Sequence, residues 1–362
     1  MNNAKIKIAI VSYSLGTGGA ERFAGALSTM LESIDYEVHH IIVNNVVDYS
    51  FSGKLYNLGA LCEPSFWMLQ KINKGLLLKK YLEREGISIV IDNRTRNSFL
   101  RDWCTNLIYG KRKVYFIIHS FYLQNYLPKS LYLASKLYQK AARIICVSKS
   151  IEEQVNQKYG LKNTITIYNP IKSIIVEAPI KIDVPEKYIL FYGRLEDEVK
   201  NFGLLLNAFF QSKIYDQGIH LVILGNGSSE TRIHGLISEL KLEKYVTMFP
   251  FQKDPFAWVK QAKFTVLTSY YEGFPMSVIE SLSLGTPVVS VDCNSGPREV
   301  IINEYNGLLV ENHNIVALSK AIRRMVDDTE LYQFCKENSI DSVSHLTYEK
   351  IAAQWKEILE KR

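Results

Sequence analysis

The chain has 362 residues, enough for two domains of ordinary size, and 47% of them are hydrophobic while 22% are charged. This balance excludes an intrinsically disordered chain, and five scattered cysteines exclude a small disulfide scaffold. The net charge of +6 hides an asymmetry, because residues 64–143 carry fifteen Lys and Arg against four acids, a balance of +11 that leaves −5 elsewhere. A basic first half indicates an anionic surface or an anionic acceptor.

The cysteines and the chain start predict the compartment. No CxxC pair is present, which is typical of thiols in a reducing compartment and of a chain without a zinc site. The first apolar run is too short for a signal peptide, and none reaches the roughly 18 residues of a spanning helix. We therefore expect a cytoplasmic protein that needs no metal and no cofactor, with a role at a membrane surface left open.

Short runs rich in Ile, Val and Tyr alternate with helical stretches in the first half. We predict six strands there: Ile6–Val11, Val38–Val43, Ser88–Ile91, Val114–Ile118, Arg143–Val147 and Thr164–Ile167. A second series follows: Tyr188–Tyr192, His220–Leu224, Val246–Phe249, Phe264–Leu267 and Pro287–Val291. Strands that alternate with crossover helices run parallel, so the predicted fold class is α/β, with two doubly wound, Rossmann-like domains in tandem.

The stretch between the two series predicts a domain boundary. Asn169–Glu186 contains three prolines and little periodicity, which is typical of a linker. Tyr348–Arg362 predicts an amphipathic helix, with Ile351, Trp355 and Leu359 at a spacing of four. The expected parts are an N-terminal acceptor domain (1–173), a linker (174–186), a C-terminal donor domain (187–345) and a helix that packs back across the domains (346–362).

A glycine-rich turn, Gly16–Gly19, separates the first strand from a predicted helix. Glycine lets backbone N–H groups and a helix N-terminus approach an anion, so Gly18 and Gly19 are candidate phosphate ligands. The alternative is a tight strand-to-helix turn that needs glycine for its geometry. A dinucleotide fingerprint is absent, since Glu21 stands at its third glycine and Asn44-Asn45 follow the second strand without an acidic ribose ligand. A dehydrogenase is therefore disfavoured.

Two cations follow the first strand of the second series. Arg194 comes directly after this strand, and Lys200 precedes a helix predicted over Phe202–Phe210. Arg as a planar fork and Lys as a point charge can neutralise a diphosphate without a metal. Two such cations alone usually mark a solvated face, but ligands of open α/β sheets bind at the carboxyl ends of strands, which supports the binding function equally.

Two glutamates lie eight residues apart in the stretch Tyr271–Glu280. Pro275 suits the first helical position, so Glu272 is expected in the preceding loop and Glu280 within the helix. Eight helical residues span roughly 12 Å, which exceeds the roughly 9.5 Å limit for the carboxylate pair of a glycosidase. We therefore interpret both as ligands for hydroxyl groups, although each alone reads as a surface glutamate.

Together these motifs resemble the retaining GT-B glycosyltransferases of family 4. The resemblance covers nearly the whole chain and rests on segments in the same order: Gly18-Gly19-Ala20-Glu21, Gly193-Arg194-Leu195 with Lys200-Asn201, Glu272-Gly273-Phe274-Pro275 with Glu280, and Gly285-Thr286-Pro287-Val288-Val289. It implies two Rossmann-like domains facing each other across a cleft, with the acceptor bound by the first domain and a nucleotide-sugar by the second.

The resemblance implies a role for each candidate residue. The donor diphosphate would be held by Arg194, Lys200 and the glycine loop, and the ribose by Glu280. The transferred sugar would be met by Glu272 and, across the cleft, by His119, which rests mainly on this resemblance because a lone His at a strand end is more often structural. The implied catalytic set is Glu272, His119, Arg194 and Lys200, and the donor-binding set is Gly18, Gly19, Arg194, Lys200, Gly225, Phe251, Gly273, Phe274, Pro275 and Glu280.

The implied activity is a metal-independent, retaining transfer from a nucleotide-sugar to a glycan or lipid-linked acceptor in bacterial surface-polysaccharide assembly. A UDP-sugar is the favoured donor and a GDP-sugar the alternative, and no nucleic-acid partner is expected. Ser295–Glu299 resembles family members that act on surface glycans. Two alternatives stay open: a sugar phosphorylase or synthase with a soluble acceptor, against which the basic first half argues, and a catalytically silent nucleotide-binding protein.

Two segments of the first half contain basic residues and no acids. Pro64–Tyr81 holds four lysines among Phe66, Trp67, Met68, Leu69, Leu76, Leu77 and Leu78. Phe121–Arg143 holds three lysines and Arg143 with Tyr122, Tyr126, Tyr132 and Tyr138. Cations beside aromatic and aliphatic groups suit a headgroup boundary, so we predict peripheral docking on the inner face of the cytoplasmic membrane. The alternative is that these apolar residues belong to the core.

Overall fold

The computed structural model describes residues 5–16, 18–62, 67–172 and 184–361, and for residues 67 and 68 the backbone alone. The chain forms two compact units. Unit 1 comprises Met1–Pro170 and Tyr348–Arg362, and unit 2 comprises Ile171–Thr347. Most of the predicted linker, residues 173–183, lies outside the described residues.

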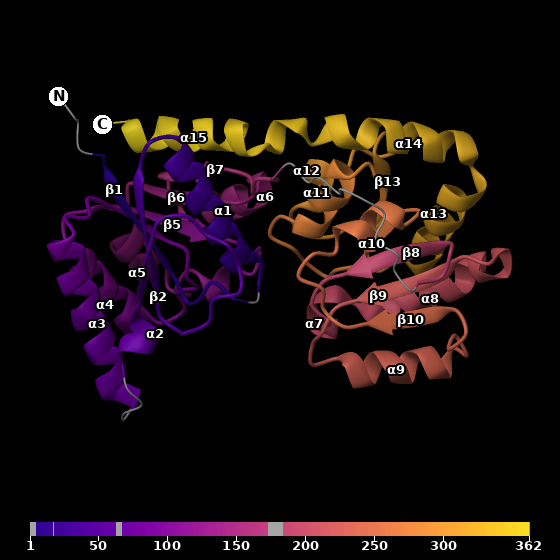
Figure 1. Cartoon of the computed structure of the whole chain (residues 1–362), viewed down its shortest axis with the longest axis horizontal. Coiled ribbons are helices and arrows are strands. Elements are labelled where there is room, and N and C mark those ends of the chain that lie inside the picture. The colour runs from indigo at the N-terminus through magenta and orange to yellow at the C-terminus, as the bar shows by residue number, and fades with distance from the viewer. Residues whose placement is uncertain (1–4, 17, 63–66, 173–183, 362) are drawn as a thin grey trace. The chain divides into compact units, whose positions relative to one another are not determined.

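Unit 1 contains a parallel seven-stranded sheet in the order β3-β2-β1-β4-β5-β6-β7 (Figure 1). Its strands are β1 (Lys7–Ser12), β2 (Glu37–Ile42), β3 (Lys54–Asn57), β4 (Ile89–Asp92), β5 (Lys113–Ile118), β6 (Arg143–Cys146) and β7 (Thr164–Thr166). All six predicted strands are present. The sequence analysis missed β3, because this edge strand is short and half-exposed and therefore lacks an apolar run.

The helices of unit 1 cover both faces of this sheet, with α1 and α15 on one face and α3 and α4 on the other (Figure 1). Their bounds are α1 (Gly19–Ser33), α2 (Leu58–Leu61), α3 (Trp67–Arg84), α4 (Phe99–Tyr109), the 3-10 helix η1 (Leu123–Asn125), α5 (Leu131–Tyr138), α6 (Lys149–Tyr159) and α15 (Tyr348–Glu360). The predicted apolar face of α15 is buried, since Ile351, Trp355 and Leu359 are almost inaccessible. The Tyr115 hydroxyl of β5 donates to the carbonyl of Ile358, which ties α15 to the sheet.

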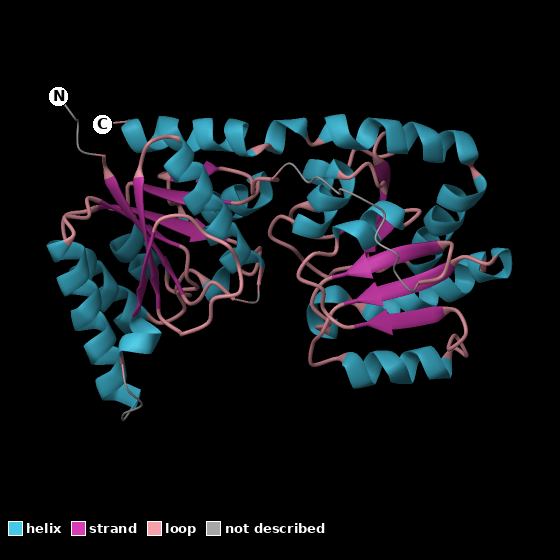
Figure 2. Ribbon diagram, in the orientation of Figure 1, coloured by secondary structure: helices cyan, strands magenta, loops and turns pink. Residues whose placement is uncertain are grey.

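Unit 2 contains a parallel six-stranded sheet in the order β10-β9-β8-β11-β12-β13 (Figure 2). Its strands are β8 (Tyr188–Tyr192), β9 (His220–Leu224), β10 (Val246–Phe249), β11 (Thr265–Leu267), β12 (Val288–Asp292) and β13 (Gly307–Glu311). All five predicted strands are present. The analysis missed β13, an edge strand whose second half is only partly buried.

The helices of unit 2 cover both faces of its sheet. Their bounds are α7 (Asp197–Lys200), α8 (Phe202–Ser212), η2 (Ile214–Gln217), α9 (Glu230–Glu239), α10 (Phe256–Gln261), α11 (Met276–Ser283), α12 (Pro297–Val300), α13 (Ile315–Asp327), α14 (Thr329–Ser342) and η3 (Ser344–Leu346). Alternate strand residues point to opposite faces: Phe191 packs with α8 and α13, whereas Leu190 packs with α10. Two doubly wound units are the architecture predicted from the sequence.

Candidate functional site

In unit 2 the candidate residues follow the ends of four adjacent strands. Arg194 comes after β8, Gly225 after β9, Phe251 after β10 and Glu272 after β11. Parallel strands end at one edge of a sheet, so these residues gather at the carboxyl edge, where ligands of doubly wound domains bind. The Arg194 side chain is exposed, and among the described residues it has no hydrogen-bond partner.

Lys200 and Glu272 meet at this edge. Lys200 Nζ donates to Glu272 Oε1 over 2.6 Å, and Ser269 Oγ donates to the same oxygen over 2.6 Å. The backbone of Lys200 is held as well, because Thr268 Oγ1 donates to its carbonyl. Both members of the ion pair are mostly buried. The chain thus places an ammonium and a carboxylate side by side, and Ser269 is a contributor that the sequence analysis missed.

The loop from Glu272 to Pro275 is held by the segment that follows β12. The Glu272 N–H donates to the carbonyl of Asn294, and Ser295 Oγ donates to the carbonyl of Gly273 over 2.7 Å. A Cβ atom on Gly296 would lie 2.5 Å from Pro275 Cδ, so glycine is needed for this close approach. The Ser295-Gly296 dipeptide therefore shapes the loop that carries Gly273, Phe274 and Pro275.

Glu280 lies within α11 and is only 2% exposed. The helix begins at Met276 with Pro275 as its N-cap, one residue later than predicted, a normal uncertainty for helix bounds. Glu272 lies in the preceding loop, as expected. Carboxylates are mostly exposed in proteins, so this buried position differs from the surface glutamate that the residue type alone suggests.

Gly225 and Gly227 allow the β9 loop to pack on the backbone after β8. A Cβ atom on Gly225 would lie 1.9 Å from the Gly193 oxygen, and one on Gly227 would lie 2.3 Å from the Leu195 oxygen. Between them, Asn226 Oδ1 accepts from the Phe251 N–H over 2.8 Å. Phe251 is 50% exposed. The structure thus gives Gly225 a packing role and leaves the Phe251 ring open to solvent or ligand.

In unit 1 the glycine turn leads into α1. Gly18 is the N-cap of α1 with φ at +152°, a conformation that favours glycine. Gly19 begins the helix, and a Cβ atom there would meet no atom of the described residues within 4 Å. The fold therefore requires glycine at 18 for its backbone, whereas at 19 there is free space in front of a fifteen-residue helix. Free space at a helix N-terminus suits an anion.

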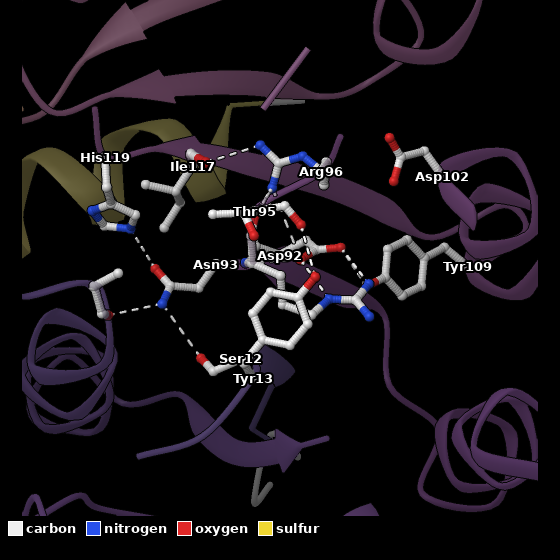
Figure 3. A network of polar contacts seen from close by, with 12 residues as sticks. Ser12, Tyr13, Asp92, Asn93, Thr95, Arg96, Asp102, Tyr109, Ile117 and His119 are labelled. Atoms are coloured by element: carbon white, nitrogen blue, oxygen red, sulfur yellow. Dashed lines mark hydrogen bonds and ion pairs between the residues drawn. The ribbon is translucent and has the colours of Figure 1, made fainter. Parts of the chain in front are cut away.

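His119 follows β5 at the carboxyl edge of the unit 1 sheet. Its Nε2 lies 2.6 Å from Asn93 Oδ1 (Figure 3). Its ring packs edge-to-face on Phe23. Burial, together with the nearby charge of Arg96, lowers the pKa of His119 to about 3. The imidazole is therefore neutral at physiological pH and acts there as a hydrogen-bonding group rather than as a cation.

A buried ionic network lies beside His119 and was missed by the sequence analysis (Figure 3). Arg94 donates from two nitrogens to the Asp92 carboxylate, and Tyr109 donates to Asp92 Oδ2 over 2.8 Å. Burial alone would raise the pKa of Asp92, but the Arg94 charge outweighs it and brings the value to about 2. Arg96 donates to the carbonyls of Asp92, Arg94 and Ile117. A signal was present, since polar residues directly follow a buried strand.

Comparison with known proteins gives the family. Residues 17–173 match the family described as Glycosyltransferase Family 4, and residues 175–342 match Glycosyl transferases group 1. An N-acetylgalactosaminyltransferase of Campylobacter jejuni, which acts on N-acetylgalactosamine-N,N'-diacetylbacillosaminyl-diphospho-undecaprenol, is 30% identical over 92% of this chain and 93% of its own length. The chain belongs to the group 1 glycosyltransferases. The resemblance stated from the motifs is confirmed.

One further relative is also a glycosyltransferase by name, and a solved structure shares the fold. A poly(ribitol-phosphate) α-N-acetylglucosaminyltransferase of Staphylococcus aureus is 27% identical over 77% of this chain and 56% of its own length. A solved structure of S. aureus TarM, a mutant in complex with UDP and other ligands, superposes with a TM-score of 0.78 at 17% identity and covers 99% of this chain and 100% of that chain. The glycosyltransferase thus has the GT-B fold. No helix within the described residues has the length and apolar character to cross a membrane.

Proposed function

We propose that this glycosyltransferase moves a sugar from a UDP-sugar to a lipid-linked or surface-glycan acceptor, with retention of configuration and without a metal. The observation that carries the proposal is the convergence of Arg194, Lys200 and Glu272 at the carboxyl edge of the unit 2 sheet. This edge offers one exposed guanidinium and one ammonium for the diphosphate, and a carboxylate for sugar hydroxyls.

The ion pair gives Lys200 and Glu272 linked roles. Before the donor binds, each partner neutralises the other. A diphosphate beside Lys200 competes for the ammonium, and Glu272 then turns to the hydroxyls of the transferred sugar. Arg194 has no partner among the described residues and meets the diphosphate directly. Fixed cations of this kind stabilise the charge that grows on the leaving group, in place of a metal.

The remaining candidates complete the donor site. We assign Glu280 to the ribose, Phe251 and Gly225 to the nucleotide pocket, and the loop of Gly273, Phe274 and Pro275 to the sugar. In unit 1, the N-terminus of α1 at Gly18 and Gly19 supplies backbone donors for the diphosphate. His119 contributes a neutral imidazole that hydrogen-bonds the sugar. UDP is the favoured nucleotide because solved structures of the same fold contain UDP.

The acceptor assignment rests on charge and on the relatives. The C. jejuni relative acts on a diphospho-undecaprenol glycan, the S. aureus relative on poly(ribitol-phosphate), and an Escherichia coli relative is a lipopolysaccharide 1,6-galactosyltransferase. The acceptors named for the first two relatives contain phosphate groups. The balance of +11 in residues 64–143 of this chain suits a negatively charged acceptor of this kind.

The predicted membrane surface needs correction at several residues. Tyr126, Tyr138 and Leu78 are nearly inaccessible and belong to the core of unit 1, so their expected place at a headgroup boundary was wrong. Phe66 and the side chains of Trp67 and Met68 lie outside the described residues. Of the apolar residues named in the prediction, those that are exposed are Leu69 and Leu76 on α3, Tyr122 before η1 and Tyr132 on α5.

A clearer apolar surface lies on α4, which contacts α3. Leu100, Trp103 and Leu107 are 67%, 48% and 60% exposed, and their spacing of three and four places them along one stripe of the helix. The neighbouring helix α3 carries the exposed lysines Lys71, Lys79 and Lys80, and the exposed Lys111 follows α4. An apolar stripe among cations fits an anionic membrane surface, and we assign peripheral docking to α3 and α4.

The experiment that tests the function combines binding and transfer. Thermal unfolding is measured with a panel of UDP- and GDP-sugars, since a ligand at about 100 times its dissociation constant stabilises by about 2.7 kcal/mol. The stabilising donor is then incubated with lipid-linked and soluble acceptors, and the anomeric configuration of the product is read by NMR. We expect that a UDP-sugar stabilises the protein, that its sugar is transferred to the lipid-linked acceptor, and that the anomeric configuration is retained. Inverted product, or phosphorolysis with a soluble acceptor, would refute the proposal.

A further inference from the structure

Asn93 joins four elements of unit 1 at one point. It directly follows β4, is nearly inaccessible, and its N–H donates to the carbonyl of Val11 in β1. Its amide Nδ2 donates to the carbonyl of Ala20 in the first turn of α1 over 2.8 Å, and to Ser12 Oγ over 3.4 Å. Its Oδ1 lies 2.6 Å from His119 Nε2 (Figure 3). No motif in the sequence analysis contained this residue.

These contacts decide which way the Asn93 amide faces. If oxygen and nitrogen were exchanged, the amide oxygen would lie 2.8 Å from the Ala20 carbonyl oxygen, and two acceptors would face each other. The observed arrangement lets both groups bond, so the oxygen faces His119. An oxygen accepts, and therefore the ring nitrogen opposite it must carry the proton. His119 is thus the Nε2–H tautomer.

This tautomer leaves Nδ1 with a lone pair. The ring nitrogen that does not face Asn93 points away from it in Figure 3. Within the described residues of unit 1, Asn93 is the one hydrogen-bond partner of the His119 ring, and Phe23 is its ring contact. Arg96 is the charged group that acts on the ring, and a positive charge disfavours protonation of Nδ1. His119 therefore presents an acceptor.

We propose that Asn93 is a positioning residue that locks His119 as the Nε2–H tautomer, so that Nδ1 accepts a hydrogen bond from one hydroxyl group of the donor sugar. The role in sugar recognition rests on the proposed function, whereas the tautomer does not. Because Asn93 also binds the first turn of α1, it fixes the position of His119 Nδ1 relative to the helix N-terminus at Gly19. Loss of Asn93 frees the ring to adopt the other tautomer, which presents a donor.

The first experiment reads the tautomer without any substrate. Nitrogen-15 spectra of the histidine side chains distinguish Nε2–H, Nδ1–H and imidazolium forms, and comparison with His119→Gln assigns the signals. We expect wild-type His119 as the neutral Nε2–H form at pH 7, and a mixture of tautomers in Asn93→Ala. An Nδ1–H or imidazolium signal in the wild-type protein would overturn the proposal.

The matched control is Asn163→Ala in the same unit. Asn163 Nδ2 also donates to two carbonyls, those of Tyr138 and Ala141, each over 3.0 Å, but it has no contact with His119. We expect Asn163→Ala to leave the His119 spectrum and kcat/KM unchanged. Asn93→Ala should lower kcat/KM about tenfold, as expected for a lost hydrogen bond. Equal losses in the two variants would show that Asn93 is merely structural.

The hydroxyl itself is identified with deoxy analogues of the donor sugar. If His119 Nδ1 accepts from one hydroxyl, the wild-type enzyme loses about tenfold in kcat/KM with the matching deoxy donor, and Asn93→Ala loses nothing further with it. If Asn93→Ala does not fold, Asn93→Ser, which keeps a polar side chain, replaces it in the same measurements. Additive losses with every deoxy donor would disprove the contact. Absence of transfer by the wild-type enzyme would instead disprove the proposed function, and the spectra would still report the tautomer.

Discussion

Lys200 and Glu272 form an ion pair with an Nζ–Oε1 distance of 2.6 Å, although they are 72 residues apart in the chain. Lys200 ends α7, which follows β8, and Glu272 lies in the loop after β11. The carboxylate also accepts from Ser269, so it is oriented before any donor arrives. Because the two charges are oriented in advance, we propose that Lys200 binds a diphosphate and that Glu272 binds hydroxyl groups.

Removal of Lys200 should therefore affect turnover more than folding. We expect Lys200→Ala to lower kcat by about 10²- to 10³-fold, as when one fixed donor to a developing charge is lost. The free energy of unfolding should fall by less than about 3 kcal/mol, because the pair is not fully buried. Arg324→Ala, which breaks the exposed pair with Glu304 in the same unit, is the control. Wild-type turnover in Lys200→Ala would exclude the proposed role.

Glu280 should contribute to nucleotide binding. Glu280→Ala is expected to weaken binding of UDP by roughly 1.5 to 3 kcal/mol, the range for hydrogen bonds to a charged group. Calorimetric titration with UDP and GDP measures this. Because Glu280 is buried, Glu280→Gln, which keeps the shape, separates lost hydrogen bonds from lost packing. Unchanged affinity in both variants would refute the ribose assignment.

Transfer should persist without divalent cations. Arg194 and Lys200 supply positive charge at the proposed diphosphate site, so EDTA should leave the initial rate within about twofold of its original value. The rate is measured before and after chelation and again after addition of Mg²⁺ or Mn²⁺. A rate that vanishes with EDTA and returns with either ion would contradict the metal-independent mechanism.

Stability should fall in acid because of His40. This histidine of β2 is fully buried against Phe51, and burial lowers its pKa to about 4 from an ordinary 6.5. The unfolded chain binds the proton first, so the stability that neutral His40 contributes is fully present above pH 6.5 and falls by about 3 kcal/mol as pH falls toward 4. Urea unfolding of wild type, His40→Phe and the exposed control His313→Phe across this window tests it. If the free energy of unfolding of His40→Phe fell with pH as steeply as that of the wild type, His40 would not be the cause.

The α4 stripe should bind anionic membranes. Wild-type protein is expected to co-sediment with vesicles that contain phosphatidylglycerol and to be released by high salt, since each cation near an anionic leaflet contributes about 1 kcal/mol. Trp103→Ser with Leu107→Ser should weaken this binding at least about tenfold, because two exposed apolar anchors are lost. Phe334→Ser, which changes an exposed apolar residue of unit 2, is the control. If equal amounts of wild-type protein stayed in the supernatant with anionic and with neutral vesicles, membrane binding by α4 would be refuted.

The strands of both sheets were predictable because their apolar runs are a local property of the chain. Tyr188–Tyr192 and His220–Leu224 agree residue for residue with β8 and β9. The exceptions, β3 and β13, are edge strands, and an edge strand buries too little surface to need an apolar run. The glycine turns were likewise visible, since tight turns require glycine locally.

By itself the sequence determined the α/β class, the tandem arrangement of two doubly wound units, and the motifs that identify the family, because periodicity and turn residues act over a few neighbours. Only the tertiary structure decided which side chains meet. The contact of Lys200 with Glu272, the bond of Asn93 to His119, and the burial of Tyr126 and Tyr138 all depend on strand order and helix packing. Residues far apart in the chain share one sheet edge through that order, and no local pattern encodes it.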